Sequence, residues 1–400
     1  MKTDTVRYKI LLSARDGFSA FALFMPLALS MGICSPFGLW GFMLCGAVLA
    51  SVYGNGAVRL SPSFYGVFLF MLCMGRIYSS REISTVLFTA GIFMLPLMLA
   101  AQKLQNHICM PKSIAAGASL GFAALMTVIM TNDYFGIGAY GITALDMLKS
   151  YRSFGFHPNW RGILFGTIVM VIMITFPRKF KKLKDYLPAQ FVAMAVTLVL
   201  NLLLNPVAAN TPMAEAGTFY SPRTPFVLPF FEINSVALPN LLASAAALAL
   251  LCTGVLFLSD NKSSNLMRGG TIGLLAACSL TSGIPMIVPP QAKSEDDEPS
   301  LGNLFFMTLF FLITVRLCNI LISRTPVASA AVLLIVGAWQ SVDWGKIKRA
   351  LTCGPLSIIL FILSFFAVLV FTVPRAVFVI FVIFVLVCLY NFRGRLYSRL

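Results

Sequence analysis

The sequence has few charged residues. Asp, Glu, Lys and Arg together make up 11% of its 400 residues, against about 25% in an average soluble domain. So few charges cannot cover the surface of a soluble globular protein. In contrast, 58% of the residues are hydrophobic and the mean hydropathy is +0.88. We therefore expect an all-α membrane protein that crosses the bilayer many times.

Patterns typical of metal sites and enzymes are also missing. The two histidines, His107 and His157, lie in predicted loops, and the nine cysteines form no Cys-x-x-Cys pair, so we expect no metal. No nucleophile lies in a recognisable pattern with a base, and the loops at 131–160 and 206–235 are short for a membrane-embedded enzyme such as a glycan polymerase. No Walker sequence is present. We expect a protein that is not an enzyme, has no cofactor and is driven by gradients if it transports.

The chain has an excess of positive charge, with a formal net charge of +16 and a pI near 9.7. Its basic residues form short clusters between apolar runs, as at 178–184 and 346–349. This arrangement is typical of cytoplasmic loops in membrane proteins. We therefore expect a lipid bilayer, and no nucleic acid, as the partner of these charges.

Twelve apolar runs are long enough to span the bilayer as helices, and two further segments, 60–75 and 285–302, are short or polar. If the latter are counted as interrupted helices, the chain has about 14 spans, and twenty of its 30 basic residues fall on the side of the N-terminus. This count predicts a cytoplasmic N-terminus at 1–16, one transmembrane domain at 17–391 and a cytoplasmic tail at 392–400. In chain order the spans are 17–34, 36–53, 60–75, 84–102, 111–130, 161–177, 188–205, 236–258, 267–284, 285–302, 303–322, 325–341, 354–372 and 374–391.

The two interrupted segments are the third span of each half, which matches a 7+7 inverted repeat. A helix that starts inside the membrane presents unpaired N–H groups and the positive end of its dipole to a cavity. Two such starts facing each other would bind an anion without a charged side chain. The alternative is that 54–63 is an ordinary loop and 281–302 a polar surface connection.

Short motifs with proline and glycine recur at the predicted spans. They are Arg15-Asp16-Gly17, Met25-Pro26, Ser35-Pro36-Phe37-Gly38, Leu60-Ser61-Pro62-Ser63, Met110-Pro111 with Gly117 and Gly121-Phe122, Leu187-Pro188, Pro225 to Pro229, Ser282-Gly283-Ile284-Pro285 and Val342-Asp343-Trp344. In this order and spacing, over 15–391, the chain resembles the SulP family of anion transporters (sulfate permeases and their relatives). We expect a member without the STAS domain that most members of this family append.

The resemblance implies a uracil-permease-like fold with two half-helices, spans 3 and 10. A core from spans 1–4 and 8–11 would carry the anion against a gate from spans 5–7 and 12–14, in an elevator-like movement. The implied substrate-binding residues are Ser61, Pro62, Ser63, Phe257, Ser282, Gly283, Pro285, Met286 and Ile287. Lys293, at membrane depth, is a candidate counter-charge; its alternative partners are the acids that follow it. Relatives of this kind often form homodimers, and a bacterial inner membrane is the expected location.

Several positions depart from the family pattern. Phe257 lies where the family usually has a Glu, Leu27 replaces a Gln, Arg268 replaces an acid, and 295–298 is unusually acidic. The sequence therefore supports two functions. The first is a secondary transporter of a small anion of the sulfate, bicarbonate or dicarboxylate class. The second is a degenerate, non-transporting relative that acts as a membrane partner or sensor.

Overall fold

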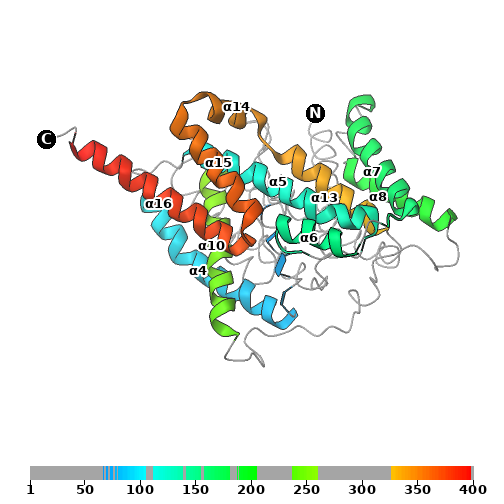
Figure 1. Cartoon of the computed structure of the whole chain (residues 1–400), viewed down its shortest axis with the longest axis horizontal. Coiled ribbons are helices and arrows are strands. Elements are labelled where there is room, and N and C mark those ends of the chain that lie inside the picture. The colour runs from blue at the N-terminus through cyan, green and yellow to red at the C-terminus, as the bar shows by residue number, and fades with distance from the viewer. Residues whose placement is uncertain are drawn as a thin grey trace, which may run out of the picture.

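The computed structural model describes residues 66, 69–70, 73–74, 77–78, 80–104, 111–137, 141–154, 157–180, 187, 189–204, 237–259 and 326–397. Every regular element among these residues is an α-helix (Figure 1). The predicted spans at 17–34, 36–53, 267–284, 285–302 and 303–322 lie outside the described residues, as does the beginning of 60–75.

Eight predicted spans are confirmed as helices. They are α4 (Ser80–Leu104), α5 (Lys112–Phe135), α7 (Trp160–Lys179), α8 (Ala189–Leu204), α10 (Leu238–Ser259), α13 (Val327–Ser341), α15 (Pro355–Val370) and α16 (Val373–Tyr397). Helix α5, helix α7 and residues 373–390 of α16 are each long and apolar enough to cross a membrane. Helices α8 and α15 have 16 residues each, which corresponds to about 24 Å.

Two stretches predicted as connections contain short helices instead, α6 (Ala144–Phe154) and α14 (Trp344–Thr352). Each begins with a side-chain cap. The Thr143 hydroxyl accepts the backbone N–H of Asp146 at 3.1 Å, and the Asp343 carboxylate accepts the backbone N–H of Lys346 at 3.1 Å. These short helices were not predicted because they are too polar and too short to span the bilayer, whereas their caps satisfy the N–H groups that a helix start leaves open.

Helix α5 lies at the centre of the larger helix group and packs against α15 through two glycines one turn apart (Figure 1). A Cβ atom on Gly117 would collide with the backbone carbonyl of Phe361, and one on Gly121 would lie 2.9 Å from Cβ of Val368. The two backbones therefore approach closely, as small residues four apart allow in membrane helices. Gly117 lies against Phe361, and Gly121, which is later in α5, lies against Val368, which is later in α15. Helices α5 and α15 therefore run in the same direction.

Helix α7 packs against α13 in a similar manner. A Cβ atom on Gly162 would lie 3.6 Å from Cβ of Ala328, and one on Gly166 would lie 3.1 Å from Cγ2 of Val332. These two helices therefore also run in parallel. A backbone hydrogen bond of 2.7 Å from Asn159 to Phe135 joins the start of α7 to the end of α5. Val332 on α13 and Tyr134 near the end of α5 both lie against Gly166, whereas Trp339, later in α13, bonds to Thr127, earlier in α5. Helices α7 and α13 therefore run opposite to α5 and α15.

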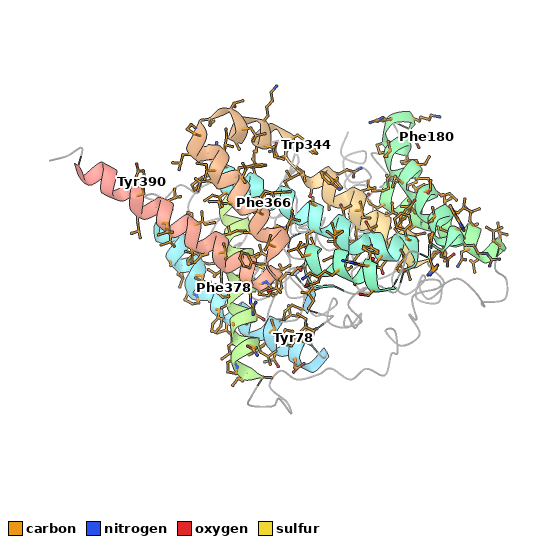
Figure 2. All side chains as sticks on the ribbon, in the orientation of Figure 1. Tyr78, Phe180, Trp344, Phe366, Phe378 and Tyr390 are labelled. Carbon is orange, nitrogen blue, oxygen red and sulfur yellow. The ribbon has the colours of Figure 1, made fainter. Side chains whose placement is uncertain are left out.

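These directions define two ends of the helix group. The start of α5, the end of α7 and helix α14 lie at one end, which we call the α14 face. The end of α5, the start of α7 and helix α6 lie at the other, the α6 face. Figure 2 shows Phe180, which follows α7, and Trp344, the first residue of α14, along the same edge of the molecule.

Helices α4 and α10 form a second group and pack extensively against each other, with α16 alongside α10 (Figure 1). Small buried residues of α10, among them Ala245, Ala249 and Cys252, allow this close packing. The hydroxyls of Tyr78 and Ser244 lie 3.4 Å apart and share a hydrogen bond, which joins the segment before α4 to α10.

Candidate functional site

Most of the predicted site lies outside the described residues. This applies to Ser61, Pro62, Ser63, Ser282, Gly283, Pro285, Met286, Ile287 and Lys293. Phe257 belongs to helix α10. The structure therefore describes parts of two elements to which predicted site residues belong, namely the end of segment 60–75 and helix α10.

The described residues of segment 60–75 form one buried helical face. Gly66, Leu69, Phe70, Cys73 and Met74 are all helical and buried, and their spacing of three and four residues is that of one side of an α-helix. The backbone N–H groups of Ile77 and Tyr78 both bond to the carbonyl of Met74, at 3.0 and 2.9 Å. These bonds close the helix with a turn shortly before α4.

The end of this segment lies at the α6 face. The Cys73 thiol donates a weak hydrogen bond of 3.9 Å to the backbone carbonyl of Ile142, and Ile142 directly precedes the residue that caps α6. The segment therefore runs from its undescribed beginning toward this face.

Helix α10 carries a buried hydroxyl one turn before Phe257. The Thr253 side chain is 8% exposed, and its Oγ1 has no hydrogen-bond partner among the residues that the structure describes. Thr89 on α4, the packing partner of α10, is 6% exposed and has the same property. A buried hydroxyl that stays without a partner costs about 1–3 kcal/mol, so Thr89 and Thr253 stand out among the described residues of these two helices.

Other threonines in the described helices behave differently. Their hydroxyls bond back to the carbonyl four residues earlier, which is the usual solution for Thr within a helix. This is the case for Thr127, Thr131, Thr167, Thr175 and Thr197, at 2.6 to 3.0 Å. Sequence reasoning missed Thr253, and its signal would have been a hydroxyl beside Gly254 in the apolar second half of this span.

The helix that carries Thr253 is uncharged, and a glycine follows this threonine. Helix α10 contains no acidic or basic residue. Within the described residues, no atom lies within 4 Å of a Cβ built on Gly254, and no group of three His, Cys, Asp or Glu side chains could hold a metal ion.

Comparison with known proteins shows the fold. No family model matches the chain, and no curated protein matches it. Among solved structures, the transmembrane domain of the cyanobacterial bicarbonate transporter BicA aligns with 94% of this chain and 97% of that domain, with a TM-score of 0.68 and 16% identity.

Two structures of SLC26A9 also match. One aligns with 98% of this chain at a TM-score of 0.70 and 12% identity. The other, the murine anion transporter in its inward-facing state, aligns with 96% at a TM-score of 0.67 and 11% identity. The chain spans 66% and 69% of these two proteins. It is therefore an integral membrane protein with the fold of the SulP/SLC26 transmembrane domain, which confirms, at the level of the fold, the resemblance predicted from its motifs.

Proposed function

We propose that this protein is a secondary transporter of a small anion, of the bicarbonate, sulfate or dicarboxylate class. The observation that carries this proposal is the match of nearly the whole chain to the transmembrane domain of a bicarbonate transporter and to an anion transporter. The match does not favour the alternative of a non-transporting partner or sensor.

The proposed anion site lies between the starts of the two half-helices, 60–75 and 285–302. If segment 60–75 is helical from Ser61 to Met74, it measures about 20 Å, whereas the hydrocarbon layer is about 30 Å thick. Because the segment ends at the α6 face, its start would lie inside the membrane. There its N–H groups and those after Pro285 would hold an anion, with the hydroxyls of Ser61, Ser63 and Ser282 nearby and Lys293 as a counter-charge.

Helix α10 would complete the site from the side. The Thr253 hydroxyl would donate to the anion, and Gly254 would leave space for it. Because α10 carries no acid, coupling to protons through this helix is not part of the proposal.

The packing supports a core that moves against a gate. Helices α4 and α10 belong to the proposed core and pack on each other, while α5, α7, α8, α13 and α15 of the proposed gate form the larger group. Helix α16 contacts α10 and α15, so it would lie at the boundary along which an elevator-like movement takes place.

The same packing supports the 7+7 inverted repeat. The repeat would relate α5 to α13 and α7 to α15, so the parallel pair α5–α15 has its counterpart in the parallel pair α13–α7. Both α5 and α13 start after a proline, Pro111 and Pro326. Helix α6 follows α5, and helix α14 follows α13, so the two short helices hold equivalent positions in the two halves.

The α14 face would be cytoplasmic, with both termini on that side. It carries Lys112, Arg178, Lys179, Lys346, Lys348 and Arg349 at described helix ends, while the α6 face carries Lys149, Arg152, Arg161 and Arg375. The excess on the α14 face agrees with the positive-inside rule. A bacterial inner membrane and a homodimer remain parts of the proposal.

Anion binding to the purified protein tests the site. We expect bicarbonate, sulfate or succinate to raise the melting temperature in a saturable manner, because a ligand that binds only the folded state stabilises it. Ser61→Leu and Ser282→Leu should abolish this rise. Ser153→Leu, an exposed position on α6, is the matched control. An undiminished rise in both Ser61→Leu and Ser282→Leu would refute the site.

A further inference from the structure

Helix α14 has three different sides. Successive residues of a helix turn by 100°, which places Ile347 and Ala350 on the side that faces the protein, where they are 7% and 4% exposed. Trp344 and Leu351 share a second side and are 58% and 45% exposed. The remaining side carries the exposed basic residues Lys346, Lys348 and Arg349.

The position of α14 puts this helix at the membrane surface. It connects α13 to α15, and the axes of α13 and α14 differ by 49°, so α14 bends away from the direction in which α13 crosses. Its buried side packs against α5 and α15, and the Ser357 hydroxyl ties its end to α15 through a 2.8 Å bond to the carbonyl of Ala350.

The aromatic residues mark the depth of this helix. The rings of Trp339 and Trp344 are stacked with centroids 6.0 Å apart, and the exposed Trp344 and Phe180 lie on the same face of the molecule (Figure 2). Exposed aromatic rings at the ends of membrane helices are typical of the layer between hydrocarbon and water. Trp344 and Leu351 are therefore directed toward acyl chains, and the basic side chains next to them reach the headgroups.

Among the described residues, one of the three basic side chains of α14 forms an ion pair. Lys346 forms an ion pair of 3.3 Å with Asp343. No ion pair is recorded for Lys348 or Arg349 within the described residues, and Lys112, Arg178 and Lys179 on the same face are exposed as well. This combination of an apolar side, a basic side and a surface position is that of a helix which attracts anionic lipid.

We propose that α14 lies in the headgroup layer and binds the phosphate groups of anionic phospholipids through Lys348 and Arg349. The partner is a lipid surface, because the apolar side of the helix needs acyl chains that a free phosphate ion cannot supply. The counterpart α6 lies on the opposite face and exposes Lys149 and Arg152 beside Leu145 and Leu148, which makes it a matched control.

Tryptophan quenching by brominated lipid measures whether anionic lipid is enriched around α14 over uncharged lipid. A Trp40→Phe/Trp160→Phe background keeps Trp339 and Trp344 as reporters on the α14 face. The full chain is reconstituted in vesicles of one composition in which either the phosphatidylglycerol or the phosphatidylcholine is brominated. We expect stronger quenching by brominated phosphatidylglycerol, since each basic residue near the surface changes the attraction of anionic lipid about 5-fold.

Charge variants show whether a change in quenching comes from the lost positive charges or from misfolding. Lys348→Gln/Arg349→Gln should bring the ratio of the two quenching constants close to one, whereas Lys348→Arg/Arg349→Lys and Lys149→Gln/Arg152→Gln should preserve it. High salt should lower the ratio in the Trp40→Phe/Trp160→Phe background itself by screening, so the test does not depend on the charge variants folding.

Three results would overturn the proposal. The first is a ratio near one in the Trp40→Phe/Trp160→Phe background without charge substitutions. The second is a ratio that Lys348→Gln/Arg349→Gln leaves unchanged, which would assign the basic side to a protein partner. The third is loss of the preference on adding glycerol phosphate at constant ionic strength, which would assign the residues to a soluble phosphate.

Discussion

The indole N–H of Trp339 on α13 donates a hydrogen bond of 2.8 Å to the hydroxyl of Thr127 on α5. Thr127 in turn donates to the carbonyl of Ala123 at 2.9 Å. This bond joins two spans that are 212 residues apart in sequence, one in each half of the chain. It connects the two halves at the centre of the larger helix group.

Removal of this bond should weaken the protein moderately. We expect Trp339→Phe and Thr127→Val each to lower the free energy of unfolding by about 1 kcal/mol, the usual size of a hydrogen bond between membrane helices. The measurement is a double-mutant cycle on unfolding in detergent. The double variant should lose less than the sum of the single losses, and strict additivity would show that the bond contributes nothing.

The close contact of α5 with α15 predicts a larger effect. Gly117→Ala should destabilise the protein by about 1–3 kcal/mol, because the new methyl group would overlap the carbonyl of Phe361 and separate the helices. Gly254→Ala is the control, since its Cβ meets no atom within 4 Å in the described part of the chain. Thermal unfolding of both variants in one detergent measures the difference, and equal melting temperatures would contradict the close packing.

Much of this helix group could be predicted from the sequence, because each of the eight confirmed spans is an apolar run that can satisfy its backbone only as a helix. Helices α6 and α14 could not be found by the same rule, since their charged residues prevent them from crossing. Their signals were local caps, Thr143 three residues before Asp146 and Asp343 three residues before Lys346. Helix pairing was not predicted, although the spacing of Gly117 with Gly121 and Gly162 with Gly166 indicates it.

The predicted site is a different case. The anion pocket was inferred from where hydrophobic runs break, and such a break says where a helix starts but not which side chains meet there. For this reason Thr253 was missed, while Phe257 was chosen from its alignment with an acidic residue of the family. The distance between the two half-helix starts stays a prediction.

The cap of α14 should make the stability of this helix depend on pH. Partial burial raises the pKa of Asp343, but hydrogen bonds from Lys346 and its positive charge lower the pKa by more, so it falls below 3.8. Because the folded-state pKa is lowered, the stabilisation is present above pH 3.8 and is lost as the pH falls through the lowered value.

Melting temperatures measured across this acidic range test whether the Asp343 carboxylate stabilises α14. Asp343→Asn keeps a capping side chain but removes the titration, so the part of the pH dependence due to Asp343 should disappear. An unchanged pH profile in this variant would show that the carboxylate does not stabilise α14.

The Thr253 hydroxyl has no hydrogen-bond partner among the described residues, so its removal should weaken anion binding without lowering the stability of the protein. Thr253→Val should weaken anion binding roughly 10-fold, the size expected for a lost hydrogen bond to a charged group. Its melting temperature without anion should stay the same or rise, since no protein bond is lost in the described structure. Thr197→Val is the control, because this buried hydroxyl bonds to the carbonyl of Ala193 and should affect stability but not binding.

Uptake into proteoliposomes tests the proposed function most directly. The purified chain should give saturable uptake of at least one labelled anion among bicarbonate, sulfate and succinate, above that of empty vesicles, and an excess of the unlabelled anion should suppress it. If reconstituted protein that melts cooperatively takes up none of the three faster than empty vesicles do, the chain is not a carrier of these anions.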